Sequence, residues 1–298
     1  MSNNFNSTVR LEEPLARYTS WQVGGMAKQY YNPVDLQDLV KFLQWLPIYE
    51  PIFWLGHGSN VLIRDKGFDG TVVHVSNNIK NIKICDNTTD QNIILKAEAG
   101  ATCAAFAKFC QQHGLVGAEF YAGIPGTIGG ALAMNAGAFG GETWRYTVKV
   151  ETINRQGQQF IRYPNEFEVG YRKVVIPNNE WFTAGYFSLQ KGDINAARKN
   201  ITELLAIRKQ NQPIDQLTCG SVFCNPDGQY AAKLIESAGL KGTKRGNAIV
   251  STKHANFIIN QGGALASDIE SLIQHIQEKV WGVHKIQLKT EVKIIGEE

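Results

Sequence analysis

Apolar and polar residues alternate along the chain with two different periods, and these divide it into predicted helices and strands. In VDLQDLVKFLQWLP, residues 34–47, apolar residues recur at helical spacing between Asp35, a candidate N-cap, and Pro47. In TCAAFAKFCQQHG, residues 102–114, the same spacing follows Thr102 as the candidate cap and ends at a glycine. Both segments predict amphipathic helices.

Short apolar or alternating runs between these helices predict strands. The run PIFWLGHGSNVLI predicts a buried strand interrupted by a Gly-Ser-Asn turn. The other extended segments are 70–75, a hairpin of 81–87 with 92–100, a hairpin within 146–163 turning at 154–157, and a second hairpin within 173–189 turning at 177–179.

From Asp193 onward the pattern becomes mainly helical, and we place a domain boundary there. Helices are predicted at 193–213 and 227–239, and a third over 267–282 opens with a candidate capping box of Ser267 and Glu270. The alternating end of the chain, 286–295, predicts a strand. These elements together indicate the α+β class with much antiparallel sheet.

Composition narrows the classes of function without naming one. The chain has 298 residues and a formal net charge of +3, and no block of like charges suggests nucleic acid as a partner. No signal-peptide pattern and no apolar run long enough to span a bilayer is found, so we expect a cytoplasmic protein that does not bind a membrane. The five scattered cysteines form no metal-binding spacing, so we expect reduced thiols and no metal site.

Glycine is the exception to this ordinary composition, with 29 residues in all. Seven of them lie among the 21 residues of AGIPGTIGGALAMNAGAFGGE, residues 122–142, in which only the last, Glu142, is charged. Bare backbone of this kind allows convergent N–H groups to bind an anion such as phosphate. A tight turn followed by a closely packed helix start explains the spacing equally well, and the glycines alone do not decide.

A second glycine loop, GHGSN at residues 56–60, directly follows a predicted strand. Two phosphate-binding loops in one domain would suit a diphosphate, and therefore a dinucleotide. The Rossmann pattern fails because Val61 stands where a third glycine is needed, and no P-loop motif is present. A dinucleotide site here would belong to another architecture.

Seven blocks resemble the UDP-N-acetylenolpyruvoylglucosamine reductase family, and they occur in that family's order from about Tyr18 to Gly296. They are GHGSNVLI, GAEFYAGIPGTIGGALAMNAGAFGGE, VGYRKVVIP, CGSVFCNP, AGLKG, HANFIIN and TEVKIIG. The resemblance implies a flavoenzyme that makes the peptidoglycan precursor UDP-N-acetylmuramate, with noncovalent FAD as cofactor and NADPH as cosubstrate.

The resemblance also implies an FAD-binding domain of the vanillyl-alcohol-oxidase (PCMH) type with two α+β lobes, 1–75 and 76–192, and a C-terminal α+β substrate-binding domain, 193–298. The residues expected at the flavin are Gly56, His57, Gly58, Ser59, Asn60, Gly123, Ile124, Pro125, Gly126, Thr127, Gly129, Gly130, Asn135, Gly137 and Ala138.

Three residues match the family's catalytic positions. Ser221 is the expected proton donor, Arg172 the cation that holds the substrate carboxylate, and Glu291 the acidic partner at the reacting centre. Taken without the family blocks, each would be read as an ordinary turn, strand or edge residue.

Other positions are expected to contact the UDP-sugar, and some depart from the family pattern. The expected contacts are Tyr171, Arg208, Asn225 and Lys209; the last is expected to replace a lysine that the family carries where this chain has Asn211. The short stretch between Arg172 and Ser221 places the chain in the family's shorter branch, without its tyrosine-bearing loop. NADPH and the UDP-sugar are expected to use one cleft in turn.

Two other readings stay open. A flavin oxidase of the same fold acting on a sugar or alcohol would need no proton donor at Ser221, and a flavin-binding regulator would need none of the three catalytic residues. For the leading reading we expect small-molecule partners only, and a monomer or weak oligomer.

Overall fold

The computed structural model describes residues 5–76, 78–85 and 92–298 of the chain. Its contacts divide the chain into two compact units, each built from more than one stretch of sequence. Unit 1 comprises residues 1–10, 30–57 and 71–207, and unit 2 comprises residues 11–29, 58–70 and 208–298. This is a different partition from the expected 1–75, 76–192 and 193–298, which stays a prediction. The α+β class is confirmed.

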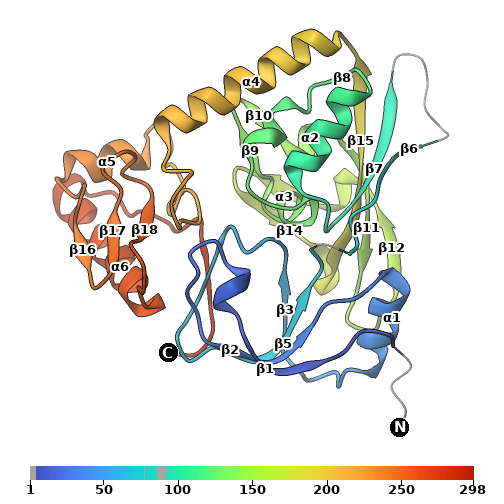
Figure 1. Ribbon diagram of the computed structural model, residues 1–298, viewed down its shortest axis with the longest axis horizontal. Coiled ribbons are helices and arrows are strands. Elements are labelled where there is room, and N and C mark those ends of the chain that lie inside the picture. Colours follow the sequence, from blue (N-terminus) through green and yellow to red (C-terminus); the bar gives the residue numbers. More distant parts are fainter. Residues whose placement is uncertain (1–4, 77, 86–91) are drawn as a thin grey trace. The chain divides into compact units, whose positions relative to one another are not determined.

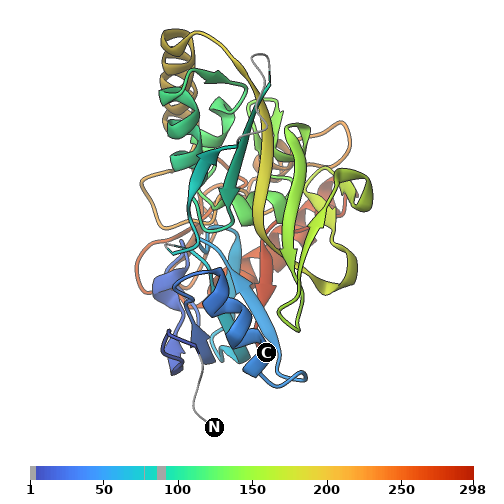
Figure 2. The ribbon, with the colours of Figure 1, turned by 90° about the vertical axis from the view of Figure 1, so that its right-hand side faces the viewer.

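Unit 1 is built around a six-stranded sheet of the order β12-β11-β15-β7-β6, with β8 paired to the end of β15. Figure 2 shows its long central strands running side by side. The bounds are β6 Ile82–Ile84, β7 Ile93–Glu98, β8 Leu115–Val116, β11 Thr147–Ile153, β12 Gln159–Arg162 and β15 Trp181–Lys191. The predicted hairpin of β6 and β7 is confirmed, although residues 86–91 between them lie outside the described part.

Two helices cover one face of this sheet (Figure 1), α2 Cys103–Gln112 and α3 Ile128–Met134. Phe106, Leu132 and Phe187, which come from both helices and from β15, are fully buried in the core between the layers. Thr102 caps α2 as expected, since its Oγ1 accepts from the N–H of Ala105 at 3.1 Å.

The remainder of unit 1 includes α1 Leu36–Trp45, whose predicted cap is also confirmed: Asp35 accepts from the N–H of Asp38 at 2.8 Å. Strand β3 Ile52–Leu55 pairs in parallel with β5 Phe68–His74 from Thr71 onward. Strands β1 Arg10–Pro14 and β2 Met26–Tyr31 come earlier in the chain, and most of each lies in unit 2. The long helix α4, Ile194–Asn211, ends before Pro213 as predicted.

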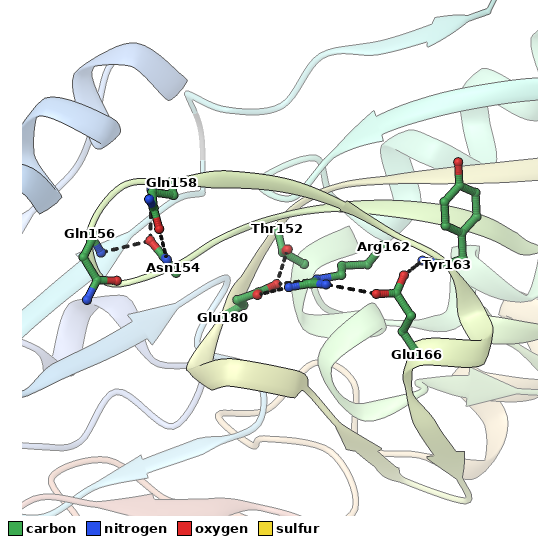
Figure 3. A network of polar contacts seen from close by, with 8 residues as sticks. All are labelled: Thr152, Asn154, Gln156, Gln158, Arg162, Tyr163, Glu166 and Glu180. Atoms are coloured by element: carbon green, nitrogen blue, oxygen red, sulfur yellow. Dashed lines mark hydrogen bonds and ion pairs between the residues drawn. The ribbon is translucent and has the colours of Figure 1, made fainter.

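The β11–β12 hairpin turns at Asn154–Gly157, as expected, because Asn154 Oδ1 accepts from the N–H groups of Gln156 and Gln158 (Figure 3). Buried Glu180 then ties this hairpin to the start of β15. It accepts from Arg162 at 2.6 Å and from the hydroxyl of Thr152 (Figure 3). Pairing and further hydrogen bonds satisfy this buried carboxylate.

The second expected hairpin, 173–189, is wrong. A 3₁₀ turn does form at Pro177–Asn179, but β14 Lys173–Val175 pairs with β13 Glu168–Gly170, whereas β15 pairs with β7, β8 and β11. The long strand β15 is apolar along most of its length, and it buries more surface in the central sheet than a short hairpin would. The actual turn is Tyr171–Arg172, so the hairpin loop presents two of the predicted site residues.

Unit 2 combines two helices with two small sheets. The bounds are β4 Val61–Ile63, α5 Ala231–Ser237, β16 Lys244–Arg245, β17 Ala248–Val250, β18 Ile258–Asn260, α6 Ala266–His284 and β19 Lys293–Ile295. Strands β16, β17 and β18 are antiparallel, and β19 lies parallel to β4. Leu62, Phe223 and Ile273 mark its core.

Two expectations for unit 2 need correction. The end of the chain is extended only at β19, because residues 286–292 pack into the core and pair irregularly with residues 222–224. Helix α6 begins at Ala266 rather than at a Ser267–Glu270 box, and Glu270 instead pairs with Arg64 at 2.8 Å. The N–H groups of Ala266 and Ser267 donate to the carboxylate of Asp65, at 2.8 and 2.9 Å. A distant residue therefore caps this helix.

No helix in the described residues is both long and apolar enough to cross a membrane. All five cysteines are free thiols.

Candidate active site

The glycine-rich segment of unit 1 is held by hydrogen bonds within the protein. The N–H groups of Ile128 and Gly129 donate to the carbonyls of Ala101 and Ala99, both at 2.8 Å. The N–H of Gly130 donates to Thr127 Oγ1 at 3.3 Å, so Thr127 caps α3. The N–H groups of Ile124 and Gly126 donate to the carbonyls of Tyr121 and Ile124. These five amides are therefore already hydrogen bonded before any anion is considered.

The glycines of this segment instead permit close packing. A Cβ on Gly129 would lie 2.8 Å from that of Ala99, and a Cβ on Gly56 would lie 2.7 Å from Thr127 Oγ1. A Cβ on Gly123 would lie 2.8 Å from the ring of Phe139. The packing reading of the glycines, which the sequence left open, thus applies at these positions. It also brings the first glycine loop against the second within unit 1.

Buried His74 contacts the first glycine loop, residues 56–60, at Gly56. Its ring Nδ1 lies 2.6 Å from the hydroxyl of Tyr30. Burial lowers the pKa of His74 to about 4, against the smaller opposing influence of a hydrogen bond with the backbone of Gly56. This neutral imidazole contacts the loop that carries exposed His57.

The loop residues beyond His57 fold into unit 2. Gly58 has a φ of +65°, and a Cβ there would lie 1.8 Å from the carbonyl oxygen of Tyr18. Its own carbonyl accepts from the N–H of Ser20 at 3.0 Å. Only glycine fits this position without rearrangement. Half-buried Ser59 and Asn60 follow it and precede β4.

Arg172 lies in unit 1 beside residues that were predicted for a different role. Its guanidinium donates to the carbonyl of Gly137 at 2.8 Å and to that of Asn135 at 3.4 Å. Arg172 has a φ of +54°, a left-handed conformation that costs an arginine about 1–2 kcal/mol. Such strain points to a functional requirement at the turn. Exposed Tyr171 stands next to it, with its ring centroid 5.2 Å from the guanidinium carbon.

Asn135 is the residue that joins the glycine segment to this hairpin. It ends α3 in a left-handed conformation, is buried, and donates through Nδ2 to the carbonyl of Gly170 and to Glu142, both at 3.1 Å. Its Oδ1 accepts from the N–H of Trp144 at 3.1 Å. The fold therefore brings Arg172 together with Asn135 and Gly137, which belong to a different sequence block.

In unit 2 the fold brings Ser221 and Glu291 onto neighbouring segments of chain. The N–H of Glu291 donates to the carbonyl of Val222 at 2.8 Å, and the N–H of Cys224 donates to Lys289 at 2.9 Å. Asn60 joins them, since its Nδ2 donates to the carbonyl of Glu291 at 3.1 Å. Ser221 and Glu291 are both half-buried, so each is partly shielded from water and still accessible.

The expected UDP-sugar contacts in unit 2 are more dispersed. Half-buried Arg208 donates to Gln212 at 3.1 Å, and burial lowers its pKa. Lys209 is exposed, and its carbonyl accepts from Lys253 at 2.6 Å. Exposed Asn225 accepts from the N–H of Ala231 at 3.0 Å, at the start of α5. These positions have their own local structural roles, and their contact with a substrate stays a prediction.

Two family models match the chain: an FAD binding domain over residues 27–161, and the C-terminal domain of UDP-N-acetylenolpyruvoylglucosamine reductase over residues 212–295. Sequence relatives carry the same name. The reductase of Coxiella burnetii (strain CbuG_Q212) is 53% identical, with 96% of this chain and 95% of the relative aligned. That of Methylococcus capsulatus is also 53% identical, over 96% and 92%.

The chain belongs to the UDP-N-acetylenolpyruvoylglucosamine reductase family.

A solved structure supports this assignment. The reductase of Thermus caldophilus superimposes with a TM-score of 0.82 at 29% identity, covering 98% of this chain and 99% of that one. The protein is thus an FAD-dependent oxidoreductase, and the prediction of FAD as cofactor is confirmed. The individual site residues remain predictions.

The charge and the size of the residues in the glycine segment of unit 1 are compatible with a bound flavin dinucleotide. Between residues 122 and 141 no carboxylate is present to repel a diphosphate. Open space faces the Cα atoms of Gly140 and Gly170, where an added Cβ would meet nothing within 4 Å. Uncharged backbone of this sort suits the close approach of a planar ring. Because five of the amides here are already hydrogen bonded, binding would depend more on surface shape than on N–H groups awaiting an anion.

Phe139 and Asn256 are not among the residues predicted from the sequence. Phe139 is 44% exposed, has a φ of +51° and packs over Gly123. An aromatic residue within a glycine-rich segment was the available signal. Asn256 lies in the block HANFIIN and contacts the segment that carries Ser221, but one sequence offers no way to distinguish it from other asparagines.

Proposed function

We propose that this protein reduces UDP-N-acetylenolpyruvoylglucosamine to UDP-N-acetylmuramate, with NADPH as the source of hydride. Membership of the reductase family supports the substrate. The observation that carries the assignment of roles is the pairing in unit 2, where the N–H of Glu291 donates to the carbonyl of Val222, the residue next to Ser221. A proton donor and an acidic partner are thus held on adjacent segments, although 70 positions separate them in the sequence.

Hydride transfer from NADPH to the methylene carbon of the enolpyruvyl group is the chemistry that bound FAD would supply. The protein residues assigned to hold it are Gly56, His57, Gly58, Ser59, Asn60, Gly123, Ile124, Pro125, Gly126, Thr127, Gly129, Gly130, Asn135, Gly137 and Ala138. Neutral, buried His74 would keep the loop at Gly56 in shape.

Ser221 would deliver the proton to the carbon next to the methylene group. A hydroxyl is a weak acid in water, so its efficiency must come from fixed position and from negative charge that develops on the substrate. Position is supplied by the hydrogen bonds of residues 222–224 to residues 289–291. Glu291 would orient the reacting group, and the hydrogen bond from Asn60 to its carbonyl keeps its backbone in place.

Arg172 would bind the substrate carboxylate. Its guanidinium has five N–H donors in a planar fork, and two carbonyls of the glycine segment set the orientation of that fork. Carboxylate binding would also stabilise the charge that builds up as hydride arrives. Lysine in its place would keep the charge but lose the planar fork.

For the nucleotide part of the substrate we assign Arg208, Lys209, Asn225 and Tyr171. Arg208 supplies a positive charge at neutral pH, since an arginine guanidinium is effectively always protonated in proteins. NADPH carries similar phosphates, so the same basic residues would serve both nucleotides in turn. We also propose that small molecules are the only partners of this site, that the chain acts as a monomer or weak oligomer, and that it works in the cytoplasm.

The decisive experiment is to mix the FAD-loaded protein with NADPH and UDP-N-acetylenolpyruvoylglucosamine and to identify the product by mass spectrometry. We expect UDP-N-acetylmuramate in stoichiometric amount with NADP⁺. NADPH consumption that is independent of the UDP-sugar and yields stoichiometric peroxide would favour a flavin oxidase instead. Absence of any flavin turnover with intact FAD binding would favour a binding protein.

A further inference from the structure

Asn256 makes an unusual set of contacts with the segment that follows Ser221. Its Oδ1 accepts from the N–H of Phe223 at 2.9 Å, and its Nδ2 donates to the carbonyl of the same residue at 2.8 Å. Its own carbonyl accepts from the N–H of Val222 at 2.9 Å. Asn256 is buried, with 4% of its surface exposed, and both residues that it contacts are 1% exposed.

These contacts take the place of a neighbouring strand. On one side, residues 222–224 pair with the main chain of residues 289–291. On the other side, the side-chain amide of Asn256 pairs with the peptide groups of Phe223 as a second backbone would. Both sides of this short segment are therefore fixed by hydrogen bonds, at a place where neither side is a regular strand.

Ser221 itself lies between this fixed segment and a glycine. Gly220 has a φ of +74°, and a Cβ there would meet nothing within 4 Å, so its packing places little restraint on the chain before Ser221. The position of the serine hydroxyl is then determined mainly from its C-terminal side, by Val222 and Phe223. Whatever holds those two residues also places the hydroxyl.

We propose that Asn256 is a positioning residue that sets the place of the Ser221 hydroxyl for proton transfer, an inference that rests on the function proposed above. Asn256 does not touch the substrate in this proposal and acts only through residues 222 and 223. Removing its amide would let the segment shift, and a displacement of about 1 Å can slow a reaction by about 10²-fold.

The test uses the full-length, FAD-loaded protein and separates its two half-reactions by stopped-flow absorbance of the flavin. For Asn256→Ala we expect reduction by NADPH at the normal rate and reoxidation by UDP-N-acetylenolpyruvoylglucosamine slowed by about 10²-fold. Asn256→Asp retains an acceptor for the N–H of Phe223 but has no donor for its carbonyl when ionised. We expect it to slow reoxidation at least about tenfold, and it provides the result if the alanine variant does not fold.

Asn260→Ala is the matched control. Asn260 is also buried and also bonds to backbone on two sides, to the carbonyl of Trp21 at 2.8 Å and to the N–H groups of Gly262 and Ala264 at 2.8 and 3.0 Å. A purely structural loss should affect both variants alike, whereas positioning should slow reoxidation only in the Asn256 variant. Hydrogen exchange should show lost protection at the N–H groups of Val222 and Phe223 in Asn256→Ala.

The double variant Ser221→Ala/Asn256→Ala decides how Asn256 acts. If it works through the serine hydroxyl, the double variant is no slower than Ser221→Ala alone. The inference would be overturned if the two substitutions slowed reoxidation by the product of their separate effects. It would also be overturned if Asn256→Ala slowed both half-reactions equally, or slowed reoxidation no more than Asn260→Ala does. Normal reoxidation in Ser221→Ala would instead overturn the proposed function, whereas slow Ser221→Ala with normal Asn256 variants would reject this inference alone.

Discussion

The two regions that carry the predicted site residues are built in different ways. In unit 1, the first half of the glycine segment is held by residues 99–101 and by its own Thr127, and its second half also bonds to Gly170 and Arg172. In unit 2, the site segment 220–224 is held by residues 256 and 289–291, and Asn60 reaches Glu291 from far along the chain. The first region depends on the absence of side chains, and the second depends on side-chain amides that pair with backbone.

This difference explains why one region was easy to detect in the sequence and the other was not. Glycines that pack at close distance leave a concentrated local signal. Asparagines that pair with a distant peptide leave no local signal, since their partner is set only by the fold.

The largest effect is expected for Ser221→Ala. Loss of a positioned proton donor should slow flavin reoxidation by the UDP-sugar by roughly 10²–10⁴-fold, because the developing charge no longer receives a proton. Reduction of the flavin by NADPH should proceed at the normal rate. Stopped-flow absorbance measures both steps, and equal damage to the two would contradict the role assigned to this hydroxyl.

Gly58→Ala should be the most destabilising of the glycine changes, by roughly 2–5 kcal/mol. It combines a left-handed φ with a Cβ placed 1.8 Å from the carbonyl of Tyr18. Gly239→Ala is the control in the same unit, since Gly239 also has a left-handed φ, +73°, but a Cβ there meets nothing within 4 Å. It should cost only about 1–2 kcal/mol. Urea denaturation of both proteins measures the difference, and equal losses would show that the close contact is relieved at low cost.

Within α3, Gly129→Ala and Gly130→Ala should act in opposite directions on the protein without flavin. A Cβ at Gly129 lies 2.8 Å from that of Ala99 and should destabilise by about 1–3 kcal/mol. At exposed Gly130 the nearest atom is 3.6 Å away, so alanine should stabilise the helix by about 0.5–1 kcal/mol.

The same pair tests the flavin surface. If Gly130 faces the cofactor, as its assignment requires, Gly130→Ala should weaken FAD binding although it stabilises the apoprotein. Thermal unfolding with and without added FAD measures both effects. Unchanged FAD affinity would remove Gly130 from the binding surface and leave only a packing role to the segment.

The smallest effect concerns two helix caps, one local and one distant. Asp35→Ala removes the cap of α1 within its own turn, and Asp65→Ala removes a cap that reaches α6 from about 200 positions away. Each should cost about 0.5–2 kcal/mol in urea denaturation, with flavin binding unchanged. If Asp65→Ala lowered the free energy of unfolding far less than Asp35→Ala does, Asp65 would not act as a stabilising cap of α6.

Acid should remove the contribution of Asp65 in a defined direction. Partial burial acts to raise its pKa, but hydrogen bonds from Ser267 and from the N–H of Ala266 outweigh it, and the net pKa is lowered. A lowered pKa means that the stabilisation is present above the pKa of an unfolded aspartate, about 3.9, and is lost as the pH falls through the folded value. The difference between wild type and Asp65→Ala should therefore shrink below about pH 4.

Local patterns predicted much of the fold. The caps at Asp35 and Thr102, the turn at Asn154–Gly157 and the ends of α2 and α4 all follow from residues within a few positions of one another. The failures share a cause. The second hairpin was wrong because the competition between β14 and β11 for the strand β15 depends on buried area in the sheet. The start of α6 was wrong because its cap is Asp65.

The sequence by itself determined the family, the flavin and the candidate residues. Each was recognised from a short block of neighbouring residues, and this recognition requires no knowledge of the block's contacts in space. Only the tertiary structure decided that the glycine amides are already hydrogen bonded and that Arg172 donates to the carbonyls of Asn135 and Gly137. It also decided that Asn256 is hydrogen bonded to the segment after Ser221. The physical reason is that hydrogen bonds and close packing are made between atoms near in space. Chain distance predicts such contacts within a turn or a hairpin and carries little information beyond that.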